Sequence, residues 1–323
     1  MHEKPNSGYD IIGDVHGHAE MLKALLKELG YRHGSGTWRH DGGRKAIFVG
    51  DLIDRGPEQM ETVEIVRRMV DQDVALCIMG NHEYNAIQHR LGLRKLNETD
   101  PHHTFLAQVK ADRVPYRACL DWFMTLPLWL DMGNFGVVHA CWDTCSMDVV
   151  KTLGLGPDCT IPEKLHRLAA SGKPDKEKPD SGKPEDADDR RAYRALENIL
   201  KGPELRLPDG FSFTDKDHKE RHEIRTRWYK DDAKTYRDLA FMSEQDAANI
   251  PDLPVPEDLV SMVPDKPVFI GHYWQDKAAE KKRLSDKVVC VDYSAGIDGP
   301  LVAYRWNKGD TALLESRFVH VGR

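Results

Sequence analysis

Residue types that ligate metals gather in three short segments within the first 83 residues. The segments read GDVHG at 13–17, GDLIDRG at 50–56 and GNHE at 80–83. Each begins with a glycine, which lets the backbone turn sharply where side chains must converge. Two further histidines, His139 and His272, follow short apolar runs later in the chain. Carboxylate, imidazole and amide ligands together suit manganese, iron or zinc better than calcium, which prefers oxygen ligands alone.

The five positions together indicate a metal site more strongly than any one of them does. A single Asp or His at the end of a strand is usually a cap or a turn residue, but five such positions in one chain are not explained in that way. A carboxylate at Asp51 could bridge two ions, and a pair of ions about 3.5–4 Å apart activates a water while holding phosphate oxygens. The residues therefore predict hydrolysis of a phosphoester.

The elements that must position these residues are strands alternating with helices. Apolar residues recur at helical spacing over Ala19–Leu29 and again from Pro57 to Val70. Such repeats predict a sheet with helices packed on it, and ligands bind at the carboxyl ends of its strands. The predicted strands are 9–12, 46–49, 74–79, 135–138, 267–270, 288–291 and 301–306.

The composition restricts the class of protein further. The chain has 323 residues and a formal net charge of −7, which disfavours nonspecific binding to nucleic acid or to an anionic membrane. The N-terminal residues 1–9 hold Lys4 but not the apolar region of a signal peptide after it, and the longest apolar run, 123–130, contains Thr125 and Pro127. We expect neither export nor a membrane span, and a cytoplasmic protein.

The six cysteines are too sparse for a disulfide-stapled scaffold, which agrees with a reducing compartment. Cys141 and Cys145 form a CxxxC with no second cysteine pair, so we interpret them as ordinary thiols rather than zinc ligands.

One segment cannot contribute to a core. Residues 171–189 read SGKPDKEKPDSGKPEDADD and contain no large apolar side chain, which predicts a mobile low-complexity loop. It lies inside a longer insertion, at about 145–265, between strands of the core. We therefore predict one domain over 1–323 that is discontinuous in sequence.

The order and spacing of GDVHG, GDLIDRG and GNHE resemble the phosphoprotein phosphatase branch of the calcineurin-like metallophosphoesterase superfamily, which includes bacterial serine/threonine phosphatases and diadenosine tetraphosphatase-like enzymes. His139, His272 and the stretch 291–304 extend the likeness. The resemblance implies an α/β fold, a β-sandwich flanked by helices (α/β/β/α), with inserted lid segments.

The resemblance also implies roles for individual residues. His82 would protonate the leaving oxygen, with Asp54 orienting its imidazole, and Arg55 and Asn81 would bind the phosphate. A second phosphate-binding arginine is expected at Arg225 or Arg227, and we assign Arg227. The implied ligands of two divalent transition-metal ions, with manganese favoured and iron or zinc also suitable, are Asp14, His16, Asp51, Asn81, His139 and His272.

One position departs from many phosphodiesterase relatives, which end this part of the site in Gly-His-x-His. Here the last histidine is replaced by Trp274, which cannot ligate a metal. This is the pattern of the phosphoprotein phosphatase branch, and Glu83 agrees with it, since aspartate is common there in dinucleoside polyphosphate hydrolases.

The resemblance thus implies a phosphomonoesterase similar to serine/threonine protein phosphatases, with a metal-bound hydroxide attacking phosphorus directly. The alternative is a dinucleoside polyphosphate hydrolase, so the expected partner is a phosphorylated protein or a nucleotide polyphosphate. A third interpretation, a metal-bound scaffold or RNA-binding module without turnover, is disfavoured because His82 and Arg55 are both present.

Overall fold

Two β-sheets form the centre of the protein. The computed structural model describes residues 7–110, 113–174, 184, 186–214, 220–256 and 262–322. The first sheet has the order β15-β14-β1-β4-β5, with β1, β4 and β5 parallel and β14 antiparallel to β1. Its strands are β1 (Gly8–Ile12), β4 (Lys45–Phe48), β5 (Ala75–Cys77), β14 (Leu301–Asn307) and β15 (Phe318–Val321).

The second sheet has the order β13-β12-β7-β6. Strand β12 is parallel to both β7 and β13, whereas β6 is antiparallel to β7. The strands that we expected in one sheet are therefore divided between two. The members of this sheet are β6 (Trp129–Asp131), β7 (Gly136–Val138), β12 (Val268–Ile270) and β13 (Val288–Cys290).

The sheets pack face to face through a buried apolar layer. Ile11 and Ile47 of the first sheet share this layer with Val137, Phe269 and Val289 of the second. Neighbouring residues on the same strands point the other way, because side chains alternate across a strand. Ile12 and Phe48 thus join the core beneath the helices. The predicted sandwich flanked by helices is confirmed.

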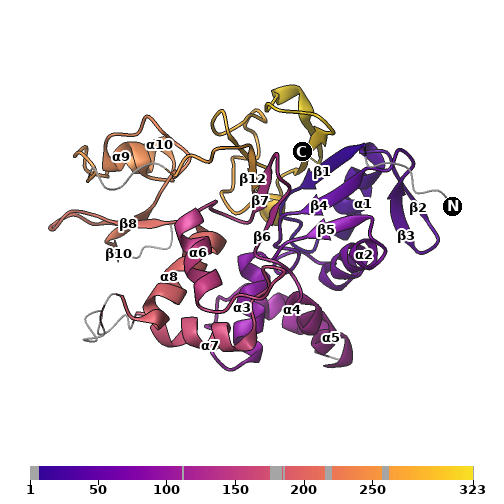
Figure 1. Cartoon of the computed structure of the whole chain (residues 1–323), viewed down its shortest axis with the longest axis horizontal. Helices are drawn as coiled ribbons and strands as arrows, with labels where there is room; N and C mark the ends of the chain where they lie inside the picture. The colour runs from indigo at the N-terminus through magenta and orange to yellow at the C-terminus, as the bar shows by residue number, and fades with distance from the viewer. Residues whose placement is uncertain are drawn as a thin grey trace.

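Helices α1 (Ala19–Glu28) and α2 (Gln59–Asp71) lie beside the first sheet, with the hairpin of β2 (Tyr31–Gly34) and β3 (Thr37–His40) next to them (Figure 1). The sequence predicted both helices, but α2 begins two residues after Pro57. The hairpin and the edge strand β15 were not predicted.

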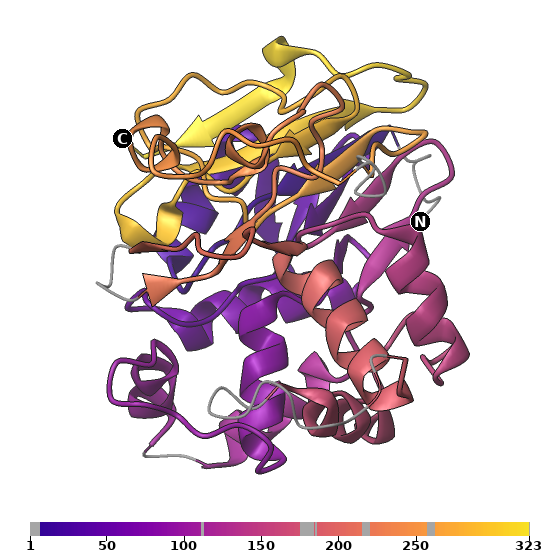
Figure 2. The ribbon, with the colours of Figure 1, turned by 90° about the vertical axis from the view of Figure 1, so that its left-hand side faces the viewer.

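A group of helices lies below the sheets in Figures 1 and 2. Three of them follow β5 and three follow β7. They are α3 (Asn81–Arg90), α4 (His102–Val109), α5 (Arg113–Phe123), α6 (Thr144–Thr152), α7 (Glu163–Gly172) and α8 (Asp188–Lys201).

The predicted insertion returns to the strand beside the one it left, since β7 and β12 are hydrogen-bonded neighbours. Of the expected loop 171–189, residues 175–183 and 185 lie outside the described part, while Ser171 and Gly172 end α7 and Asp188 begins α8. The insertion also has a small core of its own, formed by Leu207, Ile224, Tyr236, Ala240 and Ile250.

This small core joins short elements, drawn in orange at the left of Figure 1. They are β8 (Glu204–Arg206), β9 (Phe213–Thr214), β10 (Glu220–Arg221), β11 (Glu223–Arg225), α9 (Tyr236–Leu239) and α10 (Glu244–Ala247). Two 3₁₀ turns, η1 (Ala295–Ile297) and η2 (Glu315–Arg317), flank β14.

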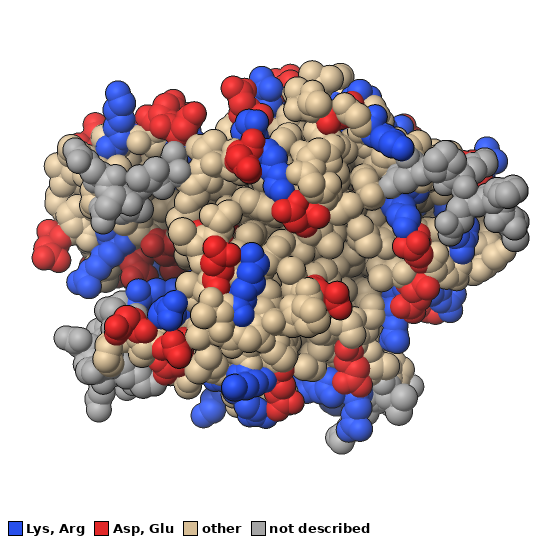
Figure 3. All heavy atoms as spheres, in the orientation of Figure 1, with Lys and Arg blue, Asp and Glu red and all other residues tan. Residues whose placement is uncertain are grey.

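Acidic and basic side chains are interspersed over the face shown in Figure 3. Within the described residues, no helix is long and apolar enough to cross a membrane.

Candidate functional site

The site lies where loops from both sheets meet. Loops after β1 and β4 carry Asp14, His16 and Asp51, and Asn81 is the first residue of α3, which follows β5. The ends of β7 and β12 add histidines from the second sheet. Two groups of ligand atoms form, each with all its atoms within 4.8 Å of one another, and both groups include Asp51. Asp51, the predicted bridging residue, is thus common to both groups. The groups are His16, Asp51 and His82, and Asp51, His139 and His272.

Three side chains converge beside one oxygen of Asp51. Asn81 Oδ1 lies 3.0 Å from His139 Nε2 and 2.8 Å from His272 Nδ1, and His139 Nε2 is 3.4 Å from Asp51 Oδ1. His139 Nδ1 donates to the carbonyl oxygen of Val49 at 2.7 Å, so in the neutral imidazole the Nε2 lone pair faces this point. Facing lone pairs repel unless a cation or a proton lies between them, and the donor set therefore fits a metal ion.

The pKa of His139 also indicates a site for a cation. Burial lowers it, but the Asp51 carboxylate, together with Asp14 and the hydrogen bond to Val49, raises the pKa to about 10. The imidazole thus lies where positive charge is strongly favoured.

His16 lies beside the second oxygen of Asp51, whereas Asp14 lies next to His272 and belongs to neither group of ligand atoms. His16 Nε2 is 3.7 Å from Asp51 Oδ2, and its Nδ1 donates to Ile53 O at 2.8 Å, which leaves the Nε2 lone pair free for a metal. Asp14 Oδ2 accepts the backbone N–H of His272 at 3.1 Å. Asp14 Oδ1 is buried and has no hydrogen-bond partner among the described residues. A bound cation would satisfy this oxygen.

Asp292 is a site residue that the sequence did not single out as a candidate ligand. Its buried carboxylate accepts the N–H of Ser294 at 2.9 Å and stands close enough to Asp14 to affect its ionisation. Burial and then Asp292 raise the pKa of Asp14 well above its usual range, and burial raises that of Asp292 to about 6. Buried carboxylates this close need a cation to remain ionised together.

His82 and Asp54 form the expected pair. His82 Nδ1 lies 2.5 Å from Asp54 Oδ2, and its Nε2 lies 3.8 Å from Asp51 Oδ2, on the metal-ligand side. The other oxygen of Asp54 is 3.0 Å from Nδ1 of His102, a fully buried imidazole that the sequence did not indicate. Although burial opposes it, hydrogen bonds from the two imidazoles lower the pKa of Asp54 to about 2.

The two predicted arginines of the insertion are placed differently. Arg225 Nη1 lies 3.0 Å from His272 Nε2, at the edge of the ligand group. Arg227 Nη2 instead donates to the carbonyl oxygen of Met242 at 2.9 Å. The structure therefore brings Arg225, rather than the assigned Arg227, to the site. Arg55 is exposed, and a Cβ added to Gly296 would lie 2.8 Å from its Cδ.

Buried Glu83 holds two of the loops together. Its carboxylate accepts the N–H groups of Gly80, Asp51 and Leu52 at 3.0, 2.8 and 2.8 Å. The side chain faces the backbone, so its identity bears on loop geometry rather than on the choice of substrate. Several site residues adopt a left-handed backbone, which is strained for non-glycine residues and is concentrated at functional sites. They are His16, Asp51, Asp54, Arg55, His272 and Ser294.

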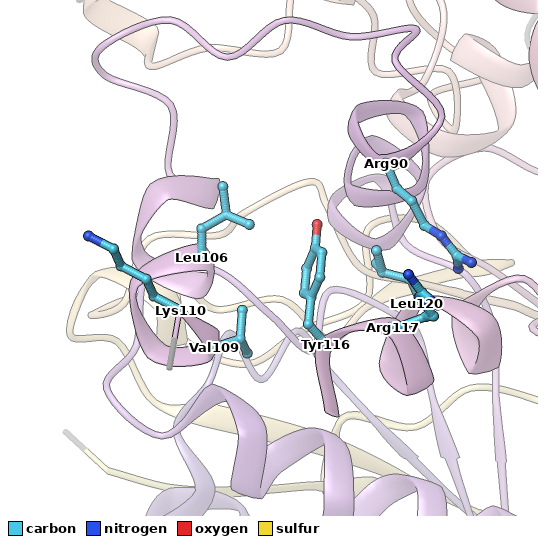
Figure 4. Close-up of a pocket in the computed structure, with 7 residues that line it drawn as sticks. All are labelled: Arg90, Leu106, Val109, Lys110, Tyr116, Arg117 and Leu120. Carbon is cyan, nitrogen blue, oxygen red and sulfur yellow. The ribbon is translucent and has the colours of Figure 1, made fainter. Parts of the chain in front are cut away.

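A cavity lies among α3, α4 and α5, apart from the metal-ligand groups. It has a volume of about 410 Å³ and is lined by apolar side chains and three basic ones. Figure 4 shows Tyr116 between Leu106 and Val109 on one side and Arg90 on the other. None of its lining residues belongs to the metal-ligand groups.

Comparison with known proteins gives related sequences for the N-terminal half. Residues 9–168 match the family model described as calcineurin-like phosphoesterase. A protein from Oceanobacillus iheyensis named bis(5'-nucleosyl)-tetraphosphatase PrpE (asymmetrical) is 35% identical over 136 residues, which are 41% of this chain and 54% of that protein. One of the same name from a Geobacillus species is 40% identical over 139 residues, 41% of this chain and 56% of the relative.

The chain thus spans about half the length of these curated relatives. Among solved structures, a cold-active protein-tyrosine phosphatase of a psychrophilic Shewanella is 16% identical with a TM-score of 0.49, covering 93% of this chain and 75% of its own.

Proposed function

We propose that this chain, whose residues 9–168 match the calcineurin-like phosphoesterase family model, is a phosphoester hydrolase that works with two bound divalent metal ions. The observation that carries the proposal is the shared carboxylate of Asp51, which belongs to both groups of ligand atoms. Ions held there would activate water and neutralise phosphate oxygens. The residues assigned to hold them are Asp14, His16, Asp51, Asn81, His139 and His272.

Manganese is the ion we favour, because the proposed ligands mix imidazole nitrogen with carboxylate and amide oxygen. Iron or zinc would also suit this set. Calcium, which prefers oxygen ligands alone, would not.

The protein's own side chains have separate tasks around the phosphate. Arg55 lies beside His16 and binds phosphate oxygens through its planar guanidinium. We assign the second phosphate-binding arginine to Arg225, because its guanidinium reaches His272. His82 presents Nε2 toward the ligand group and gives a proton to the leaving oxygen, while Asp54 holds Nδ1 and fixes the ring.

For the substrate we favour nucleotide polyphosphates over phosphoproteins, which reverses the order expected from the sequence. The curated relatives that match this half of the chain are named as bis(5'-nucleosyl)-tetraphosphatases. Glu83, which had favoured phosphoproteins, accepts backbone N–H groups instead of facing the ligand groups.

The test uses the full chain, first stripped of metal by chelation and then supplied with manganese or calcium. Hydrolysis of an aryl phosphate should vanish on chelation and return with manganese more than with calcium. Full activity in metal-free protein would overturn the proposal. Under manganese, kcat/KM should be higher for diadenosine tetraphosphate than for a phosphoserine peptide, and the reverse order would restore the phosphomonoesterase interpretation.

A further inference from the structure

Two exposed apolar side chains flank a hollow beside the metal-ligand groups. Trp274 is 48% exposed and Ile297 is 59% exposed. Together with Asp276, Lys277 and Ser294 they line a hollow of about 190 Å³. Large apolar side chains that remain exposed at a concave surface commonly mark a binding site.

The residues that line the hollow are close neighbours of the proposed phosphate site. Trp274 follows His272 by two residues, and its N–H donates to the His272 carbonyl oxygen at 2.9 Å. Ile297 ends the turn η1, and the preceding Gly296 lies against the phosphate-binding side. A Cβ added to Gly296 would lie 2.7 Å from His16 Cδ2 and 2.8 Å from Arg55 Cδ. A molecule whose phosphate is bound at Arg55 would therefore have the hollow within reach of its remaining part.

The indole of Trp274 is held in place from the insertion. The ring of Phe241 meets it edge-on, with centroids 5.7 Å apart and an interplanar angle of 69°. The N–H of Phe241 in turn donates to the carbonyl oxygen of Arg225 at 2.7 Å. The same segment thus supports the indole and carries the arginine beside His272. A ring that is buttressed on one side and exposed on the other is suited to stacking.

The polar residues of the hollow favour a particular ligand. Lys277 is exposed and makes no ion pair with any residue in the described part of the chain, so its ammonium is available to a phosphate. Asp276 accepts the N–H of Ala278 through Oδ1 at 2.8 Å. Its second oxygen can accept an N–H from the edge of a nucleobase, whereas a phosphate there would be repelled.

We infer that Trp274, Ile297 and Lys277 form a nucleotide subsite, in which a nucleobase stacks on the indole and the neighbouring phosphate meets the lysine. The hollow is small, about 190 Å³, which suits a single nucleobase better than a folded peptide segment. The inference rests on the proposed phosphoesterase function and names its substrate class as nucleoside phosphates.

A binding experiment tests the subsite without turnover. The other six tryptophans are buried, each 7% exposed or less, so Trp274 is the exposed fluorophore. In metal-free protein, adenosine 5'-monophosphate should quench the fluorescence saturably, and inorganic phosphate should not. The quenching should disappear in Trp274→Ala. Absence of saturable quenching, or equal quenching in that variant, would overturn the subsite.

A kinetic experiment with manganese separates the subsite from the metal site. Trp274→Ala should raise KM for diadenosine tetraphosphate on the order of 10- to 100-fold, the effect expected for one lost base stack. Its kcat/KM for glycerol phosphate should change less than about twofold. Leu314→Ala removes an equally exposed apolar side chain far along the sequence and should change neither. Thermal unfolding of each variant identifies any loss of folding.

The outcomes distinguish the two proposals. If the wild-type protein binds adenosine 5'-monophosphate through Trp274 but hydrolyses no phosphate compound with any divalent metal, the phosphoesterase proposal fails and the subsite stands. If hydrolysis proceeds and Trp274→Ala weakens both substrates equally, the subsite fails alone. A dependence on Trp274 for phosphotyrosine peptides but not for nucleotides would also overturn the nucleobase assignment.

Discussion

Nδ1 of His102 lies 3.0 Å from Oδ1 of Asp54, the carboxylate that holds the proposed general acid through its other oxygen. Both imidazoles are buried, and Asp54 is 2% exposed, so these three side chains form a chain that is almost closed to solvent. His102 begins α4, 48 residues from Asp54 in sequence. Its imidazole can fix the plane of the Asp54 carboxylate and, through it, the ring of His82.

The first prediction concerns His102 as a positioning residue. His102→Leu should lower kcat for alkyl phosphates on the order of 10- to 100-fold, the usual effect of removing a partner that orients a site residue. His102→Asn keeps an N–H donor near the position of Nδ1 and should recover most of that loss. Aryl phosphates, whose leaving groups need less protonation, should be affected less. Equal losses for both substrates in both variants, with a lowered melting temperature, would indicate only a packing role.

The second prediction concerns His82 itself. His82→Asn should slow hydrolysis of alkyl phosphates about 100- to 10,000-fold and aryl phosphates far less, because a general acid matters most for a strongly basic leaving oxygen. Asp54→Asn should shift the rates in the same direction more mildly. Elemental analysis is the control, since His82 Nε2 also lies in the group with His16 and Asp51. Loss of metal in His82→Asn would make it a ligand.

The third prediction compares two proposed ligands. Asp51→Asn should lower the metal content more than His272→Asn does, because the Asp51 carboxylate lies in both ligand groups and His272 in one. The substitution preserves the shape of the side chain while removing its charge. Two ions per chain in Asp51→Asn would contradict the bridging assignment. Thermal unfolding in the presence of excess chelator should separate folding defects from metal loss.

The loops that carry the proposed ligands could be predicted, because the residues that identify them lie close together in the sequence. Asp14, Asp51 and Asn81 each lie within a few residues of a short apolar run, and the parallel strands bring those ends to one edge. The division into two sheets could not be derived in this way. A run such as 267–270 is apolar whichever strand lies beside it, so its own residues do not reveal its partner.

The choice between Arg225 and Arg227, and the contact of His102 with Asp54, depend on packing between distant segments. Arg225 ends β11, whose pairing with β8 is set by three residues on each strand. Arg227 lies two residues after Arg225, and the alternation of side chains along a strand would place both on the same face. The sequence pattern therefore could not show which of the two arginines faces the site. His102 reaches Asp54 only because α4 packs beside the loop that follows β4, where Thr104 Oγ1 accepts the N–H of Arg55 at 3.2 Å.

The fourth prediction concerns stability and pH through His166, a fully buried imidazole on α7. Its ring stacks on Tyr84 with centroids 5.1 Å apart, and its Nδ1 lies 3.0 Å from Gln88 Nε2, which can donate to it. Burial lowers the pKa of His166 to about 4, from the usual value of 6.5. The folded protein therefore keeps this imidazole neutral where the unfolded chain is protonated.

The sign of the effect follows from proton binding. Below pH 6.5 the unfolded chain binds a proton at His166 that the folded protein does not bind until about pH 4, so the free energy of unfolding falls as the pH falls through this window. The contribution at pH 5 is about 2 kcal/mol relative to pH 7.5.

His166→Gln keeps an acceptor for Gln88 and cannot titrate, so its free energy of unfolding should decline less over that interval by about this amount. His320→Gln, on the exposed part of β15, serves as the matched control. Urea unfolding of all three proteins at both pH values measures the difference, and parallel declines in His166→Gln and wild type would show that His166 is protonated in the folded protein.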